Sequence, residues 1–280
     1  MRLVRFGAAG QERPGVLDQQ GVIRDLSAHL GDWHGTALGQ ETLSRIRALR
    51  IEELPGVSAT QRLGSPVAGV GKIIGVGLNY ADHAKEAGLT APSEPLWFLK
   101  ASSSLSGPSD AIIRPRGASK LDWEVELAVI IGSKASYVSE ASASHYIAGY
   151  SVFNDVSERG FQLERGTQWT KGKSCDSFAP LGPWLVTADE ISDPGKLEVW
   201  LDVNGKRMQH SSTSNLIFSV PALISSLSGY MTLYPGDVIA TGTPGGVGLG
   251  RKPQVFLNDG DIVELGIDGL GQQRQVVKSM

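Results

Sequence analysis

Short apolar runs bounded by turn-forming residues recur along most of this chain, and they constrain its fold more than any other feature. Glycine accounts for 35 of the 280 residues, well above the average of about 7%, and it favours tight turns between short strands. Only residues 41–50 and 219–231 carry apolar side chains at helical spacing. Because strands do not alternate with helices, we expect a β-rich α+β fold and not a doubly wound sheet.

The length of the chain is near the upper limit for a single hydrophobic core. Residues 1–30 contain three short strand-like runs, and a short helix follows over 41–50. The stretch over 56–65 is poor in apolar residues. We therefore predict a small N-terminal β-rich domain over 1–70 and a larger domain over 71–280.

Charge and composition exclude several classes of protein. The 26 Lys and Arg residues nearly balance 29 Asp and Glu, without the basic run typical of nucleic-acid binding. No stretch approaches the roughly 20 apolar residues of a membrane-spanning helix. The single cysteine, Cys175, cannot form an internal disulfide, and the first residues lack the apolar core of a signal peptide. These features favour a cytoplasmic protein.

Two glutamates stand at the start of an otherwise apolar strand, in the run Asp122-Trp123-Glu124-Val125-Glu126-Leu127. Alternation in a strand directs Glu124 and Glu126 to the same face. Like charges this close repel, and burying them is unfavourable unless a cation compensates. The pattern is typical either of a metal site or of a solvent-exposed edge strand.

A third carboxylate, Asp155, follows another strand-like run that ends at Asn154. Three oxygen donors favour a hard ion such as Mg²⁺ or Mn²⁺ over zinc. His83 and Glu86 are three residues apart in a short helical turn that is predicted to end at Gly88, so they share a face. A carboxylate there could orient the imidazole as a base, although an isolated pair of this kind is also common on protein surfaces.

Two glycine-rich segments only partly match nucleotide-binding motifs. Residues 75–80 (GVGLNY) have Tyr80 where a dinucleotide fingerprint needs its third glycine. Residues 245–252 (GGVGLGRK) lack the Lys-Ser/Thr pair of a phosphate loop. Neither Ser102–Ser104 nor Cys175 lies in a nucleophile motif, and tryptophans such as Trp169 are interpreted as packing residues.

Seven blocks occur in an order that closely resembles the fumarylacetoacetate hydrolase family from about residue 70 onward. They are GLNYADHAKE, EPLWFLK, WEVELAVIIG, GYSVFNDVSER, TKGKSCDSFAPLGPWLV, LDVNGKRMQ and DVIATGTPGGVG. The first 70 residues are similar to the extra domain of the bacterial branch that includes 2,4-diketo-3-deoxy-L-fuconate hydrolase. The resemblance implies a mixed β-sandwich roll, a homodimer, and a Mg²⁺ or Mn²⁺ centre.

The resemblance also implies a role for individual residues. The metal ligands would be Glu124, Glu126 and Asp155. The catalytic residues would be Lys173 and a dyad of His83 and Glu86 on a lid that orders over the substrate. The substrate-binding residues would be Tyr80, Lys100, Arg159, Gln162 and Thr243.

The implied activity is hydrolysis of a carbon–carbon bond in a 2,4-diketo acid of the acylpyruvate type. Such a cleavage releases pyruvate and a carboxylic acid. The same metal–enolate chemistry would serve an oxaloacetate decarboxylase or a hydroxymuconate-type isomerase, and a metal-stabilised protein without turnover is a further alternative. The expected partner is a small 2-oxo acid, with neither nucleic acid nor a membrane involved.

Overall fold

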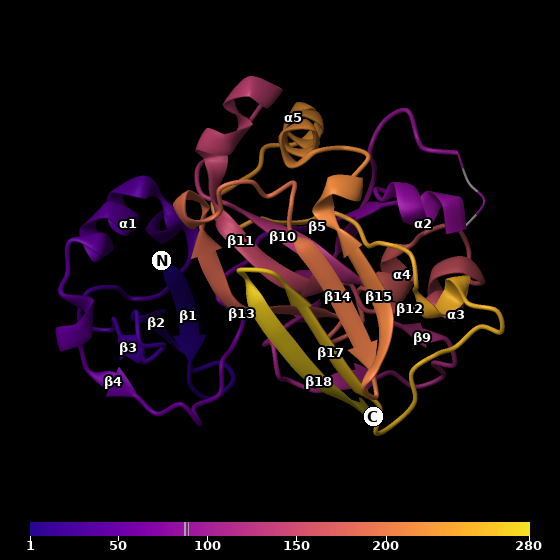
Figure 1. Cartoon of the computed structure of the whole chain (residues 1–280), viewed down its shortest axis with the longest axis horizontal. Helices are drawn as coiled ribbons and strands as arrows, with labels where there is room; N and C mark the ends of the chain where they lie inside the picture. Colours follow the sequence, from indigo (N-terminus) through magenta and orange to yellow (C-terminus); the bar gives the residue numbers. More distant parts are fainter. Residues whose placement is uncertain (87, 89) are drawn as a thin grey trace.

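The computed structural model describes residues 1–86, 88 and 90–280, and β-strands dominate its architecture (Figure 1). Across the described residues, the largest sheet has 11 strands. Its main path runs, in spatial order, through β4 (Gly56–Val57), β3 (Ile23–Asp25), β2 (Arg13–Leu17), β1 (Arg2–Phe6), β13 (Ala179–Thr187), β11 (Ile147–Asn154), β10 (Val125–Ile131), β16 (Val238–Ala240), β5 (Ile73–Gly77) and β6 (Leu96–Lys100), while β7 (Leu105–Ser106) pairs with β13.

A second sheet contains β15 (Lys206–Ser212), β14 (Glu198–Val203), β17 (Ile262–Ile267), β18 (Gly271–Ser279) and β8 (Ile112–Arg114), and a short pair joins β9 (Leu121–Asp122) to β12 (Ser157–Glu158). Most neighbouring strands are antiparallel, but β16 pairs with β5, β18 with β8 and β7 with β13 in parallel. The β-rich α+β fold with mixed sheets is therefore confirmed.

The two larger sheets pack against each other through a shared hydrophobic core. Val125 and Leu127 of β10 belong to one cluster with Val199 and Leu201 of β14 and Val263 of β17. All five side chains are buried, so each sheet loses one apolar face to the other.

The opposite face of β10 packs against the N-terminal segment. Ala128 and Ile130 join a second cluster that includes Leu3 of β1, Trp33, and Ile46 of α1 (Gln40–Arg47). Strand β1 also pairs with β13, so the N-terminal strands extend the large sheet. The division at residue 70 stays a prediction, and this sheet and cluster cross it.

Glu124 and Glu126 lie on the same face as Ala128 and Ile130, but closer to the start of β10, because residues two apart in a strand share a face. The N-terminal helix α1 lies at one end of the molecule in Figure 1, and α2 (Ala81–Glu86), α3 (Arg159–Leu163) and α4 (Thr170–Lys173) lie at the other. The acidic start of β10 therefore faces the short helices.

The helices follow the sequence patterns with small shifts. Helix α1 ends before the predicted residue 50, and Leu49 N–H donates to Ile46 O in a tighter turn. Helix α5 (Val220–Tyr230) begins after Ser219, whose hydroxyl accepts from Ala222 N–H, as expected for an N-cap. None of the helices among the described residues combines the length and apolar character needed to cross a membrane.

The short helical turn predicted to carry His83 and Glu86 is α2, and Gly88 follows it with a positive φ of 67°, which fits a glycine that ends a helix. Ala87, part of the predicted turn, lies outside the described residues. Asn204 and Gly205 form the tight turn between β14 and β15, with φ of 51° and 73°, as a type I′ turn requires.

Candidate active site

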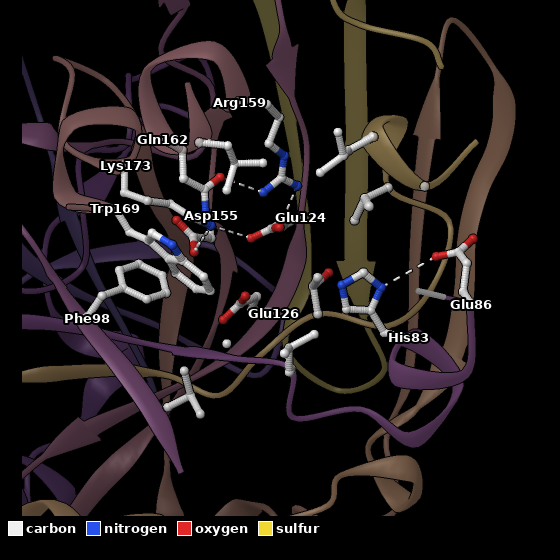
Figure 2. Close-up of a pocket in the computed structure, with 18 residues that line it drawn as sticks. His83, Glu86, Phe98, Glu124, Glu126, Asp155, Arg159, Gln162, Trp169 and Lys173 are labelled. Carbon is white, nitrogen blue, oxygen red and sulfur yellow. Dashed lines mark hydrogen bonds and ion pairs between the residues drawn. The ribbon is translucent and has the colours of Figure 1, made fainter. Parts of the chain in front are cut away.

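Three carboxylates meet at the acidic start of β10. Glu124, Glu126 and Asp155 are all buried, and each offers an oxygen that lies within 4.8 Å of an oxygen of the others. We call these three residues the carboxylate cluster (Figure 2).

The backbone brings the cluster together from neighbouring strands. Val125 of β10 pairs with Asn154 of β11, and Asp155 N–H donates to Glu124 O at 2.9 Å. Glu124 N–H is bonded to the side-chain oxygen of Asn154 at 3.2 Å, which interrupts the regular ladder. The run Asp122–Leu127, predicted as part of one strand, is therefore interrupted between β9 and β10, with Glu124 in the gap and Glu126 in β10.

Lys173 of α4 bridges two members of the carboxylate cluster. Its Nζ donates to Glu124 Oε2 and to Asp155 Oδ2, both at 2.6 Å. Burial alone would lower the pKa of Lys173, but Asp155 and Glu124 outweigh burial and raise it. The residue is therefore a buried ammonium, held where negative charge accumulates.

Arg159 of α3 holds the cluster from another side. It donates through Nη2 to Glu124 Oε1 at 2.6 Å and through Nε to Asp122 Oδ2 at 2.8 Å. Burial opposes the ionisation of Glu124, but Arg159 and Lys173 together hold its pKa below the ordinary glutamate value. Glu124 is therefore ionised.

Glu126 differs from its two neighbours. Its Oε2 accepts a hydrogen bond from Gly242 N–H at 2.8 Å, and no cationic side chain among the described residues bonds to it. Burial, followed by the charges of Asp155 and Glu124, raises the pKa of Glu126 well above its ordinary value. A cation at this position would reverse that effect.

This chemistry fits a hard divalent ion. The three side chains supply only oxygen donors, which suit Mg²⁺ and Mn²⁺. The lysine and arginine contacts do not prevent this, because each carboxylate oxygen has two lone pairs. Glu126, which has no cationic partner among the described residues, belongs to the same cluster, and a bound ion would supply the missing positive charge.

His83 and Glu86 lie on α2 across the cavity from the aromatic side chains. Figure 2 places His83 on one side of Glu126, with Phe98 and Trp169 on the other. His83 Nδ1 is 3.4 Å from Glu86 Oε2. Glu86 in turn accepts from Gly246 N–H at 3.0 Å, so a loop of the chain holds the orienting carboxylate.

A cavity of about 340 Å³ joins these groups. It is lined by most of the predicted site residues: His83, Glu86, Glu124, Glu126, Asp155, Arg159, Gln162, Lys173 and Thr243. Gln162 Oε1 accepts from Arg159 Nη1 at 3.1 Å, and Thr243 Oγ1 donates to Val125 O at 2.9 Å.

Two predicted substrate-binding residues do not line the cavity. Lys100 is buried behind the cluster, where its Nζ donates to Asp155 Oδ1 and to Val156 O. Tyr80 is also fully buried, and its hydroxyl has no hydrogen-bond partner among the described residues. Burial, then Glu126 and Asp82, raises the pKa of Tyr80.

Two glycines of the first partial nucleotide motif have a local role. A Cβ at Gly75 would lie 2.4 Å from the Phe98 ring, and one at Gly77 would lie 2.9 Å from the Trp169 ring. Glycine at these positions makes room for two aromatic rings of the cavity wall. Trp169, interpreted from the sequence as a packing residue, therefore contributes to the site.

Asp122 is a site residue that the sequence patterns did not identify. Its carboxylate accepts from the backbone N–H groups of Gly248 and Leu249 at 2.7 and 3.0 Å, and from Arg159 Nε. It connects the second glycine-rich segment to the arginine that holds Glu124. The only sequence feature that could have identified it is its position as the first residue of the Asp122–Leu127 run.

Most of this chain matches a family of known proteins. The family model described as fumarylacetoacetate (FAA) hydrolase C-terminal matches residues 72–278. A protein from Burkholderia cenocepacia, provisionally named a hydrolase, is 56% identical over 276 residues, and the match covers 98% of each chain.

Two solved structures are similar over the whole chain. Maleylpyruvate hydrolase from Sphingobium sp. SYK-6, in complex with manganese(II) ion and pyruvate, has 31% identity and a TM-score of 0.83, with 100% of this chain and 99% of that chain covered. 5-Carboxymethyl-2-hydroxymuconate delta-isomerase from Mycobacterium smegmatis has 35% identity and a TM-score of 0.79, with the same coverage. The extent of the family match, together with the 56% identical relative, shows that this chain belongs to the fumarylacetoacetate hydrolase family.

Proposed function

We propose that this protein is a divalent-metal-dependent hydrolase that cleaves a carbon–carbon bond of a 2,4-diketo acid of the acylpyruvate type. The products are pyruvate and a carboxylic acid. One observation carries the proposal: a histidine–glutamate pair and a carboxylate cluster, which come from separate segments, line the same cavity.

Glu124, Glu126 and Asp155 would hold Mg²⁺ or Mn²⁺. When bound, the ion supplies positive charge to the carboxylate and 2-oxo oxygens of the substrate. Lys173 and Arg159 contribute two further positive charges at the same end of the cavity. These charges favour a transition state in which negative charge develops on the pyruvate half.

His83 would act as the general base. Its Nδ1 faces Glu86, which leaves Nε2 free to take a proton from water. The water oxygen forms a bond to C4, the C3–C4 bond breaks, and its electron pair remains on C3 as the enolate of pyruvate. The proton then returns from His83 to C3, so atoms and charge balance.

Two related reactions would use the same end of the cavity, where the carboxylate cluster, Lys173 and Arg159 lie. Without an attacking water, a 2-oxo acid with a 3-carboxylate would lose carbon dioxide, and proton transfer between carbons would give an isomerase. The name of the similar Mycobacterium smegmatis protein refers to such an isomerase. The presence of a base and its orienting carboxylate supports hydrolysis over both.

Product analysis tests the proposal. Acetylpyruvate, oxaloacetate and a 2-hydroxymuconate would each be incubated with Mn²⁺ or Mg²⁺, or with a chelator, and the products followed by NMR. We expect metal-dependent release of acetate and pyruvate from acetylpyruvate. We expect a loss of at least about a hundredfold in His83→Ala and none in His145→Ala, a control on an exposed histidine. Turnover of oxaloacetate or of the muconate alone would contradict hydrolysis.

A further inference from the structure

One part of the cavity wall outside the carboxylate cluster is apolar. It is formed by Val76, Leu78, Phe98, Trp169, Val247 and Leu249, with Leu163 of α3 at its edge. The aromatic pair is tilted, with a distance of 5.7 Å between the ring centroids of Phe98 and Trp169. This part of the cavity is suited to a hydrocarbon group.

The cationic side chains that line the cavity already form ion pairs with carboxylates of the protein. Among the described residues that line it, these are Lys173 and Arg159. Lys173 is bonded to Glu124 and Asp155, and Arg159 is bonded to Glu124 and Asp122. Neither is placed to pair with an anionic group at the apolar end.

The formal charges around the cluster lead to the same conclusion. Four carboxylates, those of Asp122 and the carboxylate cluster, are grouped with three cations, Lys100, Lys173 and Arg159. With every one of these side chains ionised, including Glu126 as a metal ligand would be, the group carries one net negative charge. A divalent ion makes it one net positive charge, and the single carboxylate of a 2-oxo acid makes it neutral. A second substrate carboxylate would leave an uncompensated negative charge in a largely buried site.

We propose that the acyl group of the substrate is uncharged and apolar, an alkyl or aryl chain and not a carboxylate-bearing one. This inference rests on the proposed function, since it concerns the part of the substrate that is not pyruvate. The apolar wall selects for such a group by burying it, and the absence of a free cation among the described lining residues selects against a terminal carboxylate.

A second recess adjoins the cavity, and its cationic side chains offer an alternative site for a substrate carboxylate. Lys206, Arg251 and Lys252 line it, and it shares Glu86 and Gly250 with the cavity. A carboxylate tail would have to pass the Glu86 carboxylate to reach these cations. Repulsion from Glu86 disfavours this route, and the recess is the competing subsite that the test must distinguish.

Binding of non-cleavable 2-oxo acids tests the inference without depending on turnover. 2-Oxoglutarate and 5-methyl-2-oxohexanoate have the same spacing from the 2-oxo group, but the second carries an isopropyl group where the first carries a carboxylate. Titration calorimetry in saturating Mn²⁺ would give both dissociation constants. We expect 5-methyl-2-oxohexanoate to bind at least about tenfold more tightly.

A variant pair makes the test specific to the cavity wall. Leu163 lines the cavity and is 49% exposed, so Leu163→Arg would add a cation there without opening the core. Leu99 is 40% exposed and lies on the face of β6 opposite Phe98, so Leu99→Arg is the matched control. We expect only Leu163→Arg to shift the preference toward 2-oxoglutarate, by about tenfold.

The possible results separate this inference from the proposed function. Equal or tighter binding of 2-oxoglutarate to the unmodified protein would overturn the apolar acyl assignment alone. If Arg251→Met abolished that tighter binding, the adjoining recess would be the carboxylate subsite. Failure of both compounds to bind in Mn²⁺ would contradict the proposed function itself.

Discussion

Glu126 differs from the rest of the carboxylate cluster because its partner is a backbone N–H, whereas Glu124 and Asp155 face cations. Its raised pKa means that ionisation is less favourable in the folded protein than in the unfolded chain. The stability associated with its neutral form is therefore present below the ordinary glutamate pKa and is lost as the pH rises toward the folded value.

Glu126→Gln keeps a neutral, hydrogen-bonding side chain at this position. In the absence of metal at pH 8, we expect the variant to be more stable than the unmodified protein by about 1–3 kcal/mol. At pH 4 the difference should disappear. Urea denaturation across this range measures the effect, and a variant that is less stable at every pH would contradict the account.

The same variant should lose its response to metal. We expect Mn²⁺ to raise the melting temperature of the unmodified protein, since an ion that binds the folded state stabilises it. The amide introduced by Glu126→Gln is a weaker, uncharged ligand, so the shift should largely vanish in the variant. An equal shift in both proteins would place the metal elsewhere.

Lys173 is expected to act on binding and on turnover in opposite directions. Lys173→Met removes a positive charge that bonds to both Glu124 and Asp155, so Mn²⁺ should bind about tenfold more tightly. Turnover of acetylpyruvate should fall about a hundredfold, because developing negative charge loses its neighbour. Calorimetry and a pyruvate assay measure the two effects, and a parallel loss of both would indicate a structural role.

At the scale of elements, the loop after β16 determines where Glu86 lies. Gly246 donates to Glu86 and has a φ of 102°, and a Cβ there would lie 2.1 Å from Met208 O. Gly260 has a similar φ of 85°, but a Cβ there would meet nothing within 4 Å. Substitutions at Gly260 and Gly246 therefore distinguish the effect of backbone strain alone from that of strain combined with a steric clash.

We expect Gly260→Ala to destabilise the protein by about 1 kcal/mol, through its positive φ alone. Gly246→Ala should cost several kcal/mol or displace the loop, and it should reduce turnover because Glu86 loses its partner. Thermal denaturation and a pyruvate assay on both variants provide the check. Equal effects on turnover would show that the loop does not position Glu86.

Strand alternation predicted the face shared by Glu124 and Glu126, and helical spacing predicted the face shared by His83 and Glu86. Strand β18 was not predicted, because its buried positions include the glutamines Gln273 and Gln275. These side chains donate to the carbonyls of Val152 and Pro108 at 2.7 and 2.8 Å. A polar residue that is buried by such bonds removes the apolar alternation on which strand prediction depends.

For the whole molecule, the β-rich α+β character could be predicted from the spacing of short runs, but strand order could not. The pairing of β1 with β13 joins residues that are far apart in the sequence, and no local pattern encodes it. The positions of Lys100 and Asp122 behind the cluster also depend on these long-range contacts. Local patterns therefore pointed to the three carboxylates and to the His83–Glu86 pair, but not to the residues that support them.

The shared sheet has a consequence for unfolding. Leu3 and Trp33 pack in the same cluster as Ile130 and Leu185, so the predicted N-terminal domain is not expected to unfold alone. We expect urea unfolding curves from tryptophan fluorescence and from far-UV circular dichroism to coincide. Two separate transitions would show instead that residues 1–70 form an independent unit.

In the proposed function, this cavity directs water to C4 of a 2,4-diketo acid. The most direct test is cleavage of acetylpyruvate in ¹⁸O-labelled water with Mn²⁺ present, followed by mass spectrometry of the released acetate. We expect one ¹⁸O atom to be incorporated per acetate at cleavage, in a reaction that requires metal and His83. Acetate without the label, or no acetate from any acylpyruvate, would contradict it.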